Sequence, residues 1–191
     1  MTPAAVAPPD PRERLPGAIP KLRAFAISLA RDVTRADDLV QETILKAWSN
    51  IDKFDPATNL DAWLFTILRN TFYSSLRKSR REVQDSDGAF AATLSVKPAH
   101  DGRLALQEFQ RAFDLLSPEH REVLILVGAS GFSCEEAAGM MGVAIGTVKS
   151  RASRARKRLA ELLHLEDGED MFSGTDGATQ AVVLRSTAAG S

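Results

Sequence analysis

Apolar residues follow helical spacing over two long stretches of this chain, 15–81 and 103–164, and this periodicity limits the folds open to it. In the first stretch Leu22, Phe25 and Leu29 show the three- and four-residue spacing that places side chains on one face of a helix. Nowhere does an apolar–polar alternation persist over a useful strand length. We therefore predict an all-α protein with two small helical domains joined by a flexible linker.

Three segments lack this spacing and mark the limits of the predicted domains. Residues 1–14 are rich in proline and alanine, which predicts a disordered N-terminus. Residues 82–102 scatter aspartate, glycine, serine and proline without a period, as expected of a linker. Residues 165–191 contain five acids and one arginine, and we predict that they form a disordered acidic tail.

The net charge of −1 conceals two separate basic segments. Residues 69–81 carry five basic side chains and no acid, and residues 149–158 carry six basic side chains and no acid. Segregated charges of one sign indicate two surfaces that face anions. The charge distribution therefore points to nucleic acid, which the total charge does not.

Composition also argues against several other classes of protein. Cys134 is the only cysteine, which excludes an intramolecular disulfide and a four-thiolate zinc site, and we expect it to pack as a small residue. The three histidines are far apart in the sequence, so we expect neither a metal site nor a cofactor. No nucleophile–base arrangement is visible, so we do not expect an enzyme. No signal-peptide pattern or membrane-length apolar run occurs, so we expect a cytoplasmic protein.

A helix-turn-helix is predicted near the end of the second domain. Ser133 and Glu136 form a capping box that opens a short helix over residues 134–141. Gly142 can adopt the positive φ that ends this helix, and a basic helix follows over about 146–163. A short helix, a glycine turn and a basic helix are typical of a module that binds the DNA major groove.

Spacing divides the polar residues of the basic helix into two sets. Lys149, Ser153 and Arg154 lie along the side expected to enter the groove, with Ser150 and Lys157, while Arg151 and Arg156 flank it and suit phosphates. Thr147, at the helix start, is a natural phosphate contact. The alternative is a merely solvated basic helix, which the capped helix and glycine turn before it disfavour.

The third predicted helix of the first domain, residues 60–81, combines aromatic and basic side chains. This combination suits single-stranded DNA, because bases stack on rings while cations neutralise phosphates. Trp63 also shares an apolar stripe with its neighbours, so a core position is the alternative for it. Asn59 is either a plain N-cap for this helix or a contact for a flipped base.

The second predicted helix begins at Thr34, with Asp37 in a capping-box-like position. Its outer face is polar and includes Asp38, Gln41 and Glu42. A mixed polar face of this kind either docks against helices of a partner or is simply solvated.

Three strings together resemble the extracytoplasmic-function (ECF) sigma factors of the sigma-70 family. They are DDLVQETILKAW, FDPATNLDAWLFTILRN and GFSCEEAAGMMGVAIGTVKSRASRARKRL. The resemblance implies sigma region 2 over residues 15–81 and sigma region 4 over residues 103–164. It also implies a function: to guide RNA polymerase to promoters and to open the DNA there.

The resemblance assigns each group of residues a role. The residues implied to bind the clamp helices of the largest polymerase subunit are Asp37, Asp38, Gln41 and Glu42. Those implied to hold the single strand of the −10 element are Phe54, Thr58, Asn59, Trp63, Arg69, Asn70, Arg77 and Lys78. Those implied to bind the −35 element are Thr147, Lys149, Ser150, Arg151, Ser153, Arg154, Arg156 and Lys157.

A narrower resemblance concerns NIDKFDPATNLDAWLFTILRNTFYSSLRKSRREV and LVGASGFS. These strings are similar to the general-stress sigma factors of alphaproteobacteria (EcfG-like). The similarity implies control of stress-response genes and a small anti-sigma factor (NepR-like) that sequesters the protein. It further implies a response regulator with a sigma-like domain (PhyR-like) that releases it.

Two alternatives come from other classes of protein. A sigma-mimicking protein would bind an anti-sigma factor without binding DNA, but it would be expected to lose the basic residues that are intact here. An ordinary helix-turn-helix repressor would leave the DDLVQE and AWLFTILRN strings unexplained. The sigma factor is therefore the favoured interpretation.

Overall fold

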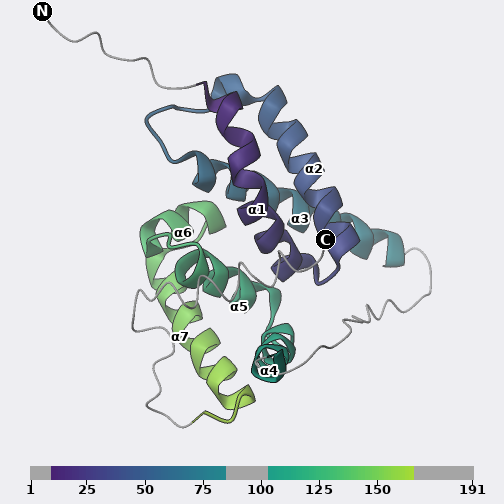
Figure 1. The fold of residues 1–191 in the computed structure, drawn as a ribbon, viewed down its shortest axis with the longest axis vertical. Coiled ribbons are helices and arrows are strands. Elements are labelled where there is room, and N and C mark those ends of the chain that lie inside the picture. The colour runs from purple at the N-terminus through teal and green to yellow at the C-terminus, as the bar shows by residue number, and fades with distance from the viewer. Residues whose placement is uncertain (1–9, 85–102, 166–191) are drawn as a thin grey trace, which may run out of the picture.

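The computed structural model describes residues 10–84 and 103–165, and this part of the chain is helical without any strand. The predicted all-α class is therefore confirmed. The helices of the first module are α1 (Pro11–Ala30), α2 (Val33–Ser49), the short 3-10 turn η1 (Ile51–Lys53) and α3 (Leu60–Gln84). Those of the second module are α4 (Arg103–Asp114), α5 (Pro118–Val123), the π-helical segment η2 (Leu124–Ala129), α6 (Cys134–Met141) and α7 (Ile145–Leu162) (Figure 1).

Aspartate side chains set the starts of the first two helices. Asp10 accepts from the Arg12 N–H at 2.8 Å with Pro11 at the first helical position, so α1 begins a few residues before the predicted start at 15. For α2 the predicted cap at Thr34 is wrong, because Asp32 accepts from the Arg35 N–H at 2.7 Å instead. Asp32, in extended conformation, therefore serves as the N-cap, and Thr34 lies inside the first turn of the helix.

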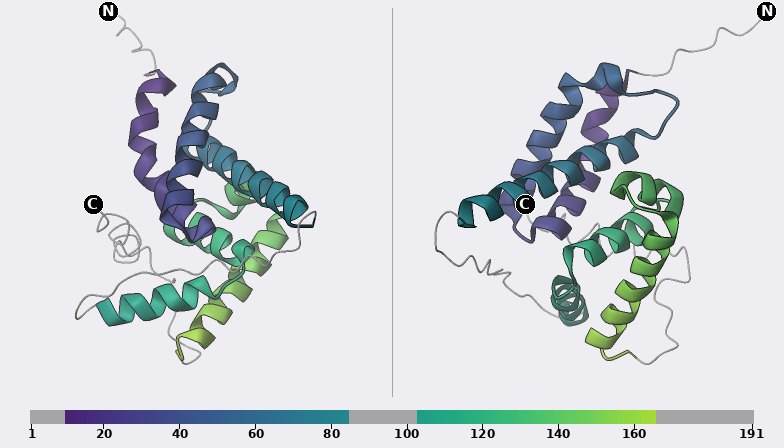
Figure 2. Two further views of the ribbon diagram at one scale, coloured as in Figure 1. Left: turned by 90° about the vertical axis from the view of Figure 1, so that its right-hand side faces the viewer. Right: turned by 180° about the vertical axis from the view of Figure 1, so that it is seen from behind.

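The first module is a three-helix unit in which α1, α2 and α3 pack on one another (Figure 2). The rings of Phe25 and Phe65 stack with centroids 4.8 Å apart at its centre. Leu64 and Leu68 continue the same buried stripe along α3. The apolar spacing of the sequence therefore becomes the inner face of each helix.

The second module contains the predicted helix-turn-helix. Ser133 and Glu136 form the expected capping box at the start of α6, and Gly142 ends it with φ 65°. Along α7 the inward residues Val148, Ala155 and Leu159 are buried against the preceding helices. The first of the two helices therefore supports the second, whose basic side stays outside.

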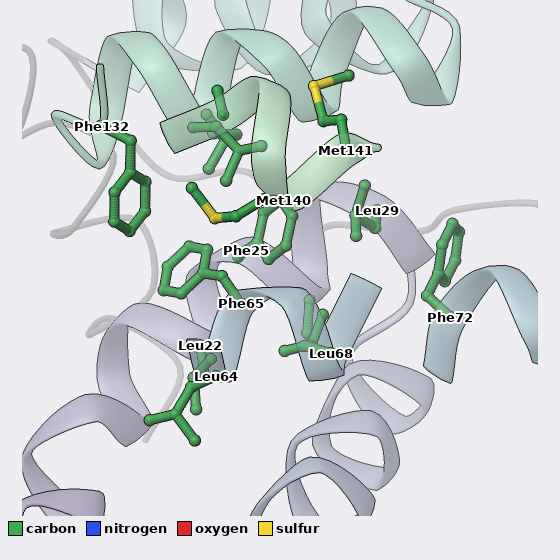
Figure 3. Packing of buried hydrophobic residues seen from close by; sticks show 14 of the residues in the cluster. Leu22, Phe25, Leu29, Leu64, Phe65, Leu68, Phe72, Phe132, Met140 and Met141 are labelled. Atoms are coloured by element: carbon green, nitrogen blue, oxygen red, sulfur yellow. The ribbon is translucent and has the colours of Figure 1, made fainter. Parts of the chain in front are cut away.

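The two modules share one apolar core. Helix α5 lies against α1, and α6 lies against α3. Phe132 and Met140 of the second module point towards Phe25 and Phe65 of the first (Figure 3), and the Phe65 and Phe132 rings meet edge-on with centroids 5.2 Å apart. The contact of α5 and α6 with α1 and α3 is called the seam. Burial of apolar side chains on both sides of the seam holds the modules together as one body.

The predicted linker and acidic tail lie outside the described residues, except at their edges. In the part of the chain that is described, none of the helices has the length and apolarity that a membrane crossing requires.

Candidate nucleic-acid interface

The basic face of α7 is open to solvent. Lys149, Ser153, Arg154 and Lys157 are exposed along one side of the helix, as their spacing predicts. Arg154 donates to the Ser150 hydroxyl at 3.2 Å, a contact one turn along the same face. Arg156 is exposed on the flank. This side, called the recognition face here, is therefore available to duplex DNA without rearrangement of α7.

The start of α7 has free capacity for an anion. Its N-cap is Ala144, which has no side-chain acceptor for the first-turn N–H groups. Thr147 is half-buried in this first turn, and its carbonyl accepts from the Ser150 hydroxyl at 3.0 Å. A phosphate placed at this end would meet the unpaired N–H groups and the positive end of the helix dipole.

Arg151 differs from the other basic residues of α7. Its side chain is half-buried, and its charge favours the ionised form of the buried Glu122 carboxyl. Arg151 therefore lies between the recognition face and the seam with the first module.

A groove opens between the end of α2 and the outer side of α3. It encloses about 430 Å³ and is called the strand groove here. Its lining residues are Lys46, Asn50, Lys53, Trp63, Ile67, Asn70, Thr71 and Ser74. Two lysines at the rim and an indole in the wall provide the charge and the stacking surface that single-stranded DNA requires.

Only two of the groove residues, Trp63 and Asn70, were predicted from the sequence. Lys46, Asn50 and Lys53 were missed, although their spacing of four and three residues places them on one side of the chain as α2 ends. Lys46 donates to Thr71 on α3 at 3.0 Å, which fixes the lysine across the groove. A search for lysines that continue the face of the second helix would have found them.

Phe54 and Trp63 form a pair beside the groove. Phe54 is only 5% exposed, so its side chain supports Trp63 from behind instead of facing DNA. The two ring centroids are 5.3 Å apart. Trp63 itself is half-buried and lines the groove, so part of its surface packs and part is accessible, and its role in DNA binding stays a prediction.

The loop before α3 places Thr58 and Asn59 at the surface. The side-chain Oδ1 of Asn59 accepts from the Asp61 N–H at 3.0 Å, which is the predicted N-cap. Its amide nitrogen donates to Glu136 of α6 at 3.4 Å. Asn59 therefore faces the helix-turn-helix and not the strand groove.

Arg69 is also turned away from the strand groove. It pairs with Glu122 of α5, and its guanidinium lies over the Tyr73 ring at 4.8 Å from the centroid. Arg77 and Lys78 are exposed on the next turns of α3. The residues predicted for the −10 strand thus divide between the groove, the seam and the exposed end of α3.

The outer face of α2 carries an apolar patch beside its polar residues. Asp38, Gln41 and Glu42 are exposed as predicted, whereas Asp37 accepts from Arg23 at 2.7 Å. Leu45 and Trp48 are 68% and 56% exposed on the same helix. Exposed large apolar side chains beside polar ones are typical of a protein–protein interface.

No group of three or more metal-binding side chains occurs within residues 10–84 and 103–165. The arrangement offers surfaces for binding DNA and protein, and the groups suited to each are those named above.

Comparison with known proteins identifies the family. The sigma-70 region 2 family matches residues 18–82, and the sigma-70 region 4 family matches residues 106–159. The ECF RNA polymerase sigma factor EcfG of Rhodopseudomonas palustris is 54% identical over 172 residues, which cover 90% of this chain and 94% of that protein. The chain belongs to the ECF sigma factors. The resemblance predicted from its motifs, including the EcfG-like type, is confirmed.

Solved structures agree with this ECF sigma factor assignment. A chain in the co-crystal structure of the sigma factor RpoE with the anti-sigma factor NepR from Bartonella quintana is 55% identical, with a TM-score of 0.74. The match covers 81% of this chain and 97% of that one. A chain in the NMR structure of the PhyRSL–NepR complex from Sphingomonas sp. Fr1 has a TM-score of 0.61 at 17% identity, with coverage of 86% and 96%, which shows a common fold alone.

Proposed function

We propose that this sigma factor brings core RNA polymerase to promoters by binding the −35 element with α7 and the melted −10 strand in the strand groove. The observation that carries the proposal is the pairing of an open basic recognition face with a lysine-lined groove on the opposite module. It acts by binding alone, and the polymerase supplies the chemistry. Its place of action is accordingly the cytoplasm, where polymerase and promoter DNA are.

Docking on polymerase is assigned to the outer face of α2. Asp38, Gln41 and Glu42 supply polar contacts, and the exposed Leu45 and Trp48 supply apolar area that is available for burial. An aromatic anchor surrounded by polar groups is the usual composition of a strong interface. Asp37 contributes through its contact with Arg23, which fixes α2 against α1.

The −35 element is assigned to the recognition face. Arg154 is exposed and long enough to donate two hydrogen bonds to a guanine edge, while Lys149 and Ser153 lie on the same side. Arg156, Lys157 and the first turn of α7 suit flanking phosphates, which hold the helix in register.

The −10 strand is assigned to the strand groove. A base removed from the duplex must be stacked and hydrogen-bonded to offset the cost of unstacking. Trp63 offers the ring, and Asn50 and Asn70 offer amide groups, with Lys46 and Lys53 close enough to meet the backbone. Thr58, Arg77 and Lys78 are exposed on either side and extend the path.

Regulation by an anti-sigma factor is proposed from the relatives. The RpoE structure from Bartonella quintana contains the anti-sigma factor NepR, and we assign this chain a NepR-like partner released by a PhyR-like response regulator. The EcfG relative supports a role at stress-response promoters.

Run-off transcription tests this proposal. Purified core polymerase from an alphaproteobacterium would be given a general-stress promoter with the wild-type chain, Arg154→Ala or Arg14→Ala. Arg14 is an exposed arginine on α1 that belongs neither to the recognition face nor to the lining of the strand groove, so it controls for loss of charge. We expect a transcript that survives Arg14→Ala and falls about 10- to 100-fold with Arg154→Ala. Absence of any transcript, together with tight binding to an anti-sigma factor, would instead indicate the sigma-mimicking alternative.

A further inference from the structure

Two adjacent residues of α5 reach across the seam into the first module. Glu122 is fully buried, pairs with Arg69 and accepts from the Tyr73 hydroxyl at 2.8 Å. Both partners lie on α3, so one carboxyl group holds two side chains of the other module. A buried carboxyl that has two donors fixes the relative position of the helices that carry them.

Arg121 makes a second set of contacts at the other end of the seam. Arg121 as a whole is 4% exposed. Its guanidinium donates to the Ser28 carbonyl at 2.7 Å and to the Leu29 carbonyl at 3.4 Å. These are carbonyls of the last turn of α1, which otherwise lack helical partners and carry the negative end of the dipole. Arg121 also donates to the Leu116 carbonyl at 2.7 Å, so it ties its own module to the end of α1.

The same seam engages the side chains of two predicted DNA-binding residues. Arg69 is held by Glu122, and Asn59 donates to Glu136. The recognition face of α7 and the strand groove stay open. In this arrangement the recognition face of α7 is open to duplex DNA. The strand groove, in contrast, lacks the charge of Arg69, which precedes the groove residue Asn70 in the chain.

We propose that Arg69, Tyr73, Arg121 and Glu122 form an interdomain clasp that keeps the free protein closed and competes with single-stranded DNA for Arg69. The proposal rests on the −10 role assigned to α3 above. Opening the clasp frees Arg69 beside the strand groove, so the apparent affinity for single strands is reduced by the fraction of molecules that are closed.

Distance measurements test the clasp independently of DNA. Fluorophores would be attached to the full chain through Ser49→Cys on α2 and Glu135→Cys on α6, in a Cys134→Ser background. Glu122→Arg places a cation next to Arg69 and near Arg151, so we expect energy transfer to fall. Arg69→Glu alone should also lower it, because two carboxylates then meet, and the double variant Arg69→Glu/Glu122→Arg should restore it.

Glu119→Arg is the control, since Glu119 is an exposed acid on the same helix and its replacement makes the same change in charge. Helix content from circular dichroism and binding of a −35 duplex show whether each variant folds. Wild-type energy transfer in both single variants overturns the clasp, as does a double variant that stays as open as the singles.

Single-strand binding tests the competition. A fluorescein-labelled mixed-sequence single-stranded DNA of about 12 nucleotides, within the span of one such binding surface, is titrated with the full chain. We expect Glu122→Arg to bind it about 10-fold more tightly than wild type, beyond any gain from Glu119→Arg. If Glu122→Arg opens the protein but binds single-stranded DNA no more tightly than Glu119→Arg does, the proposed competition for Arg69 is wrong. Promoter-dependent transcription by the wild-type chain is measured separately, so failure here is distinct from failure of the sigma-factor assignment.

Discussion

The two surfaces proposed to bind DNA differ in how they are built. The recognition face is a single side of α7, supported from behind by Val148 and Leu159. The single-strand surface is assembled from the end of α2, the loop after it and α3, and the second module engages part of it. A surface on one helix is complete once the helix forms, whereas one assembled from several segments depends on how the modules are placed.

This difference separates what each module needs in order to bind. The recognition face needs only a folded second module. The single-strand surface needs the first module and, if the clasp forms as proposed, a partner that opens it. The face of α2 that is proposed to dock on polymerase is exposed in the closed form, so it is available to such a partner.

The largest expected effect concerns the shared core, and it tests whether the two regions are independent at all. Phe65 is 1% exposed and contacts Phe25 in its own module and Phe132 in the other. Phe65→Ala should lower the free energy of unfolding by about 3–5 kcal/mol, measured by urea denaturation. Phe109→Ala in the second module should cost clearly less, because Phe109 is only half-buried. A second module that melts unchanged in Phe65→Ala would show that the seam carries no stability.

The next effect tests whether the strand groove and the recognition face bind different DNAs. Trp63→Ala removes the ring of the strand groove and should weaken single-strand binding by about 1–3 kcal/mol, the usual contribution of one stacked base. Binding of a −35 duplex should stay unchanged, since the recognition face lies on α7. Fluorescence anisotropy with both DNAs measures the two affinities. Equal losses on both would contradict the separation of the surfaces.

A smaller effect concerns the electrostatic part of the groove. Lys53→Ala should reduce the slope of log affinity against log salt for single-stranded DNA by about 0.7, the value for one phosphate contact. Arg14→Ala removes an exposed arginine that does not line the groove, and it should leave the slope unchanged. Titrations at several salt concentrations provide both slopes, and identical slopes for wild type and Lys53→Ala would remove Lys53 from the groove contacts.

The smallest effect is the pH dependence of closure. Burial raises the pKa of Glu122 in spite of Arg69, Tyr73 and Arg151 around it, and burial likewise raises the pKa of Asp114 beside Arg31 and Arg121. The closed form therefore binds these protons more tightly. Closure should strengthen as pH falls through the raised pKa values, and the gain should be complete only below the ordinary values of 4.5 for Glu122 and 3.8 for Asp114.

Energy transfer between the labels on α2 and α6 measures this dependence at constant ionic strength, with a change in the closing equilibrium of about 10-fold for each unit of pKa shift. Glu122→Gln, which does not titrate, is the control and should show a smaller dependence. Closure that weakens on acidification would contradict the assignment to these carboxyl groups.

Local chemistry explains why much of the fold was predictable from the sequence. The capping box of Ser133 and Glu136 and the turn at Gly142 depend on residues within a few positions of one another, so the helix-turn-helix follows from short-range rules. The recognition face follows for the same reason, because helical spacing alone sorts its side chains.

Other parts of the site depend on contacts between distant residues. Arg69 and Glu122 are 53 positions apart, and no local pattern indicates that they meet. Trp48 is exposed with Leu45 on the outer side of α2, although Ala47 next to it is fully buried. Phe54 precedes a polar loop yet is buried beneath Trp63. In each case tertiary placement, which periodicity does not contain, decides the role of the residue.

The π-helical segment Leu124–Ala129 sets an angle as well as a path. A π turn is an α-helix that has accepted one additional residue, and each residue of a helix advances the chain by about 100° around its axis. In this segment the Ser130 N–H donates to the Ile125 carbonyl at 2.7 Å, five positions earlier. Deletion of Gly128 would restore ordinary helical phase and turn everything that follows by one such step. Phe132 would leave the seam, and the recognition face of α7 would point in another direction. This single additional residue therefore fixes the rotation of α6 and α7 about the helix axis relative to α5.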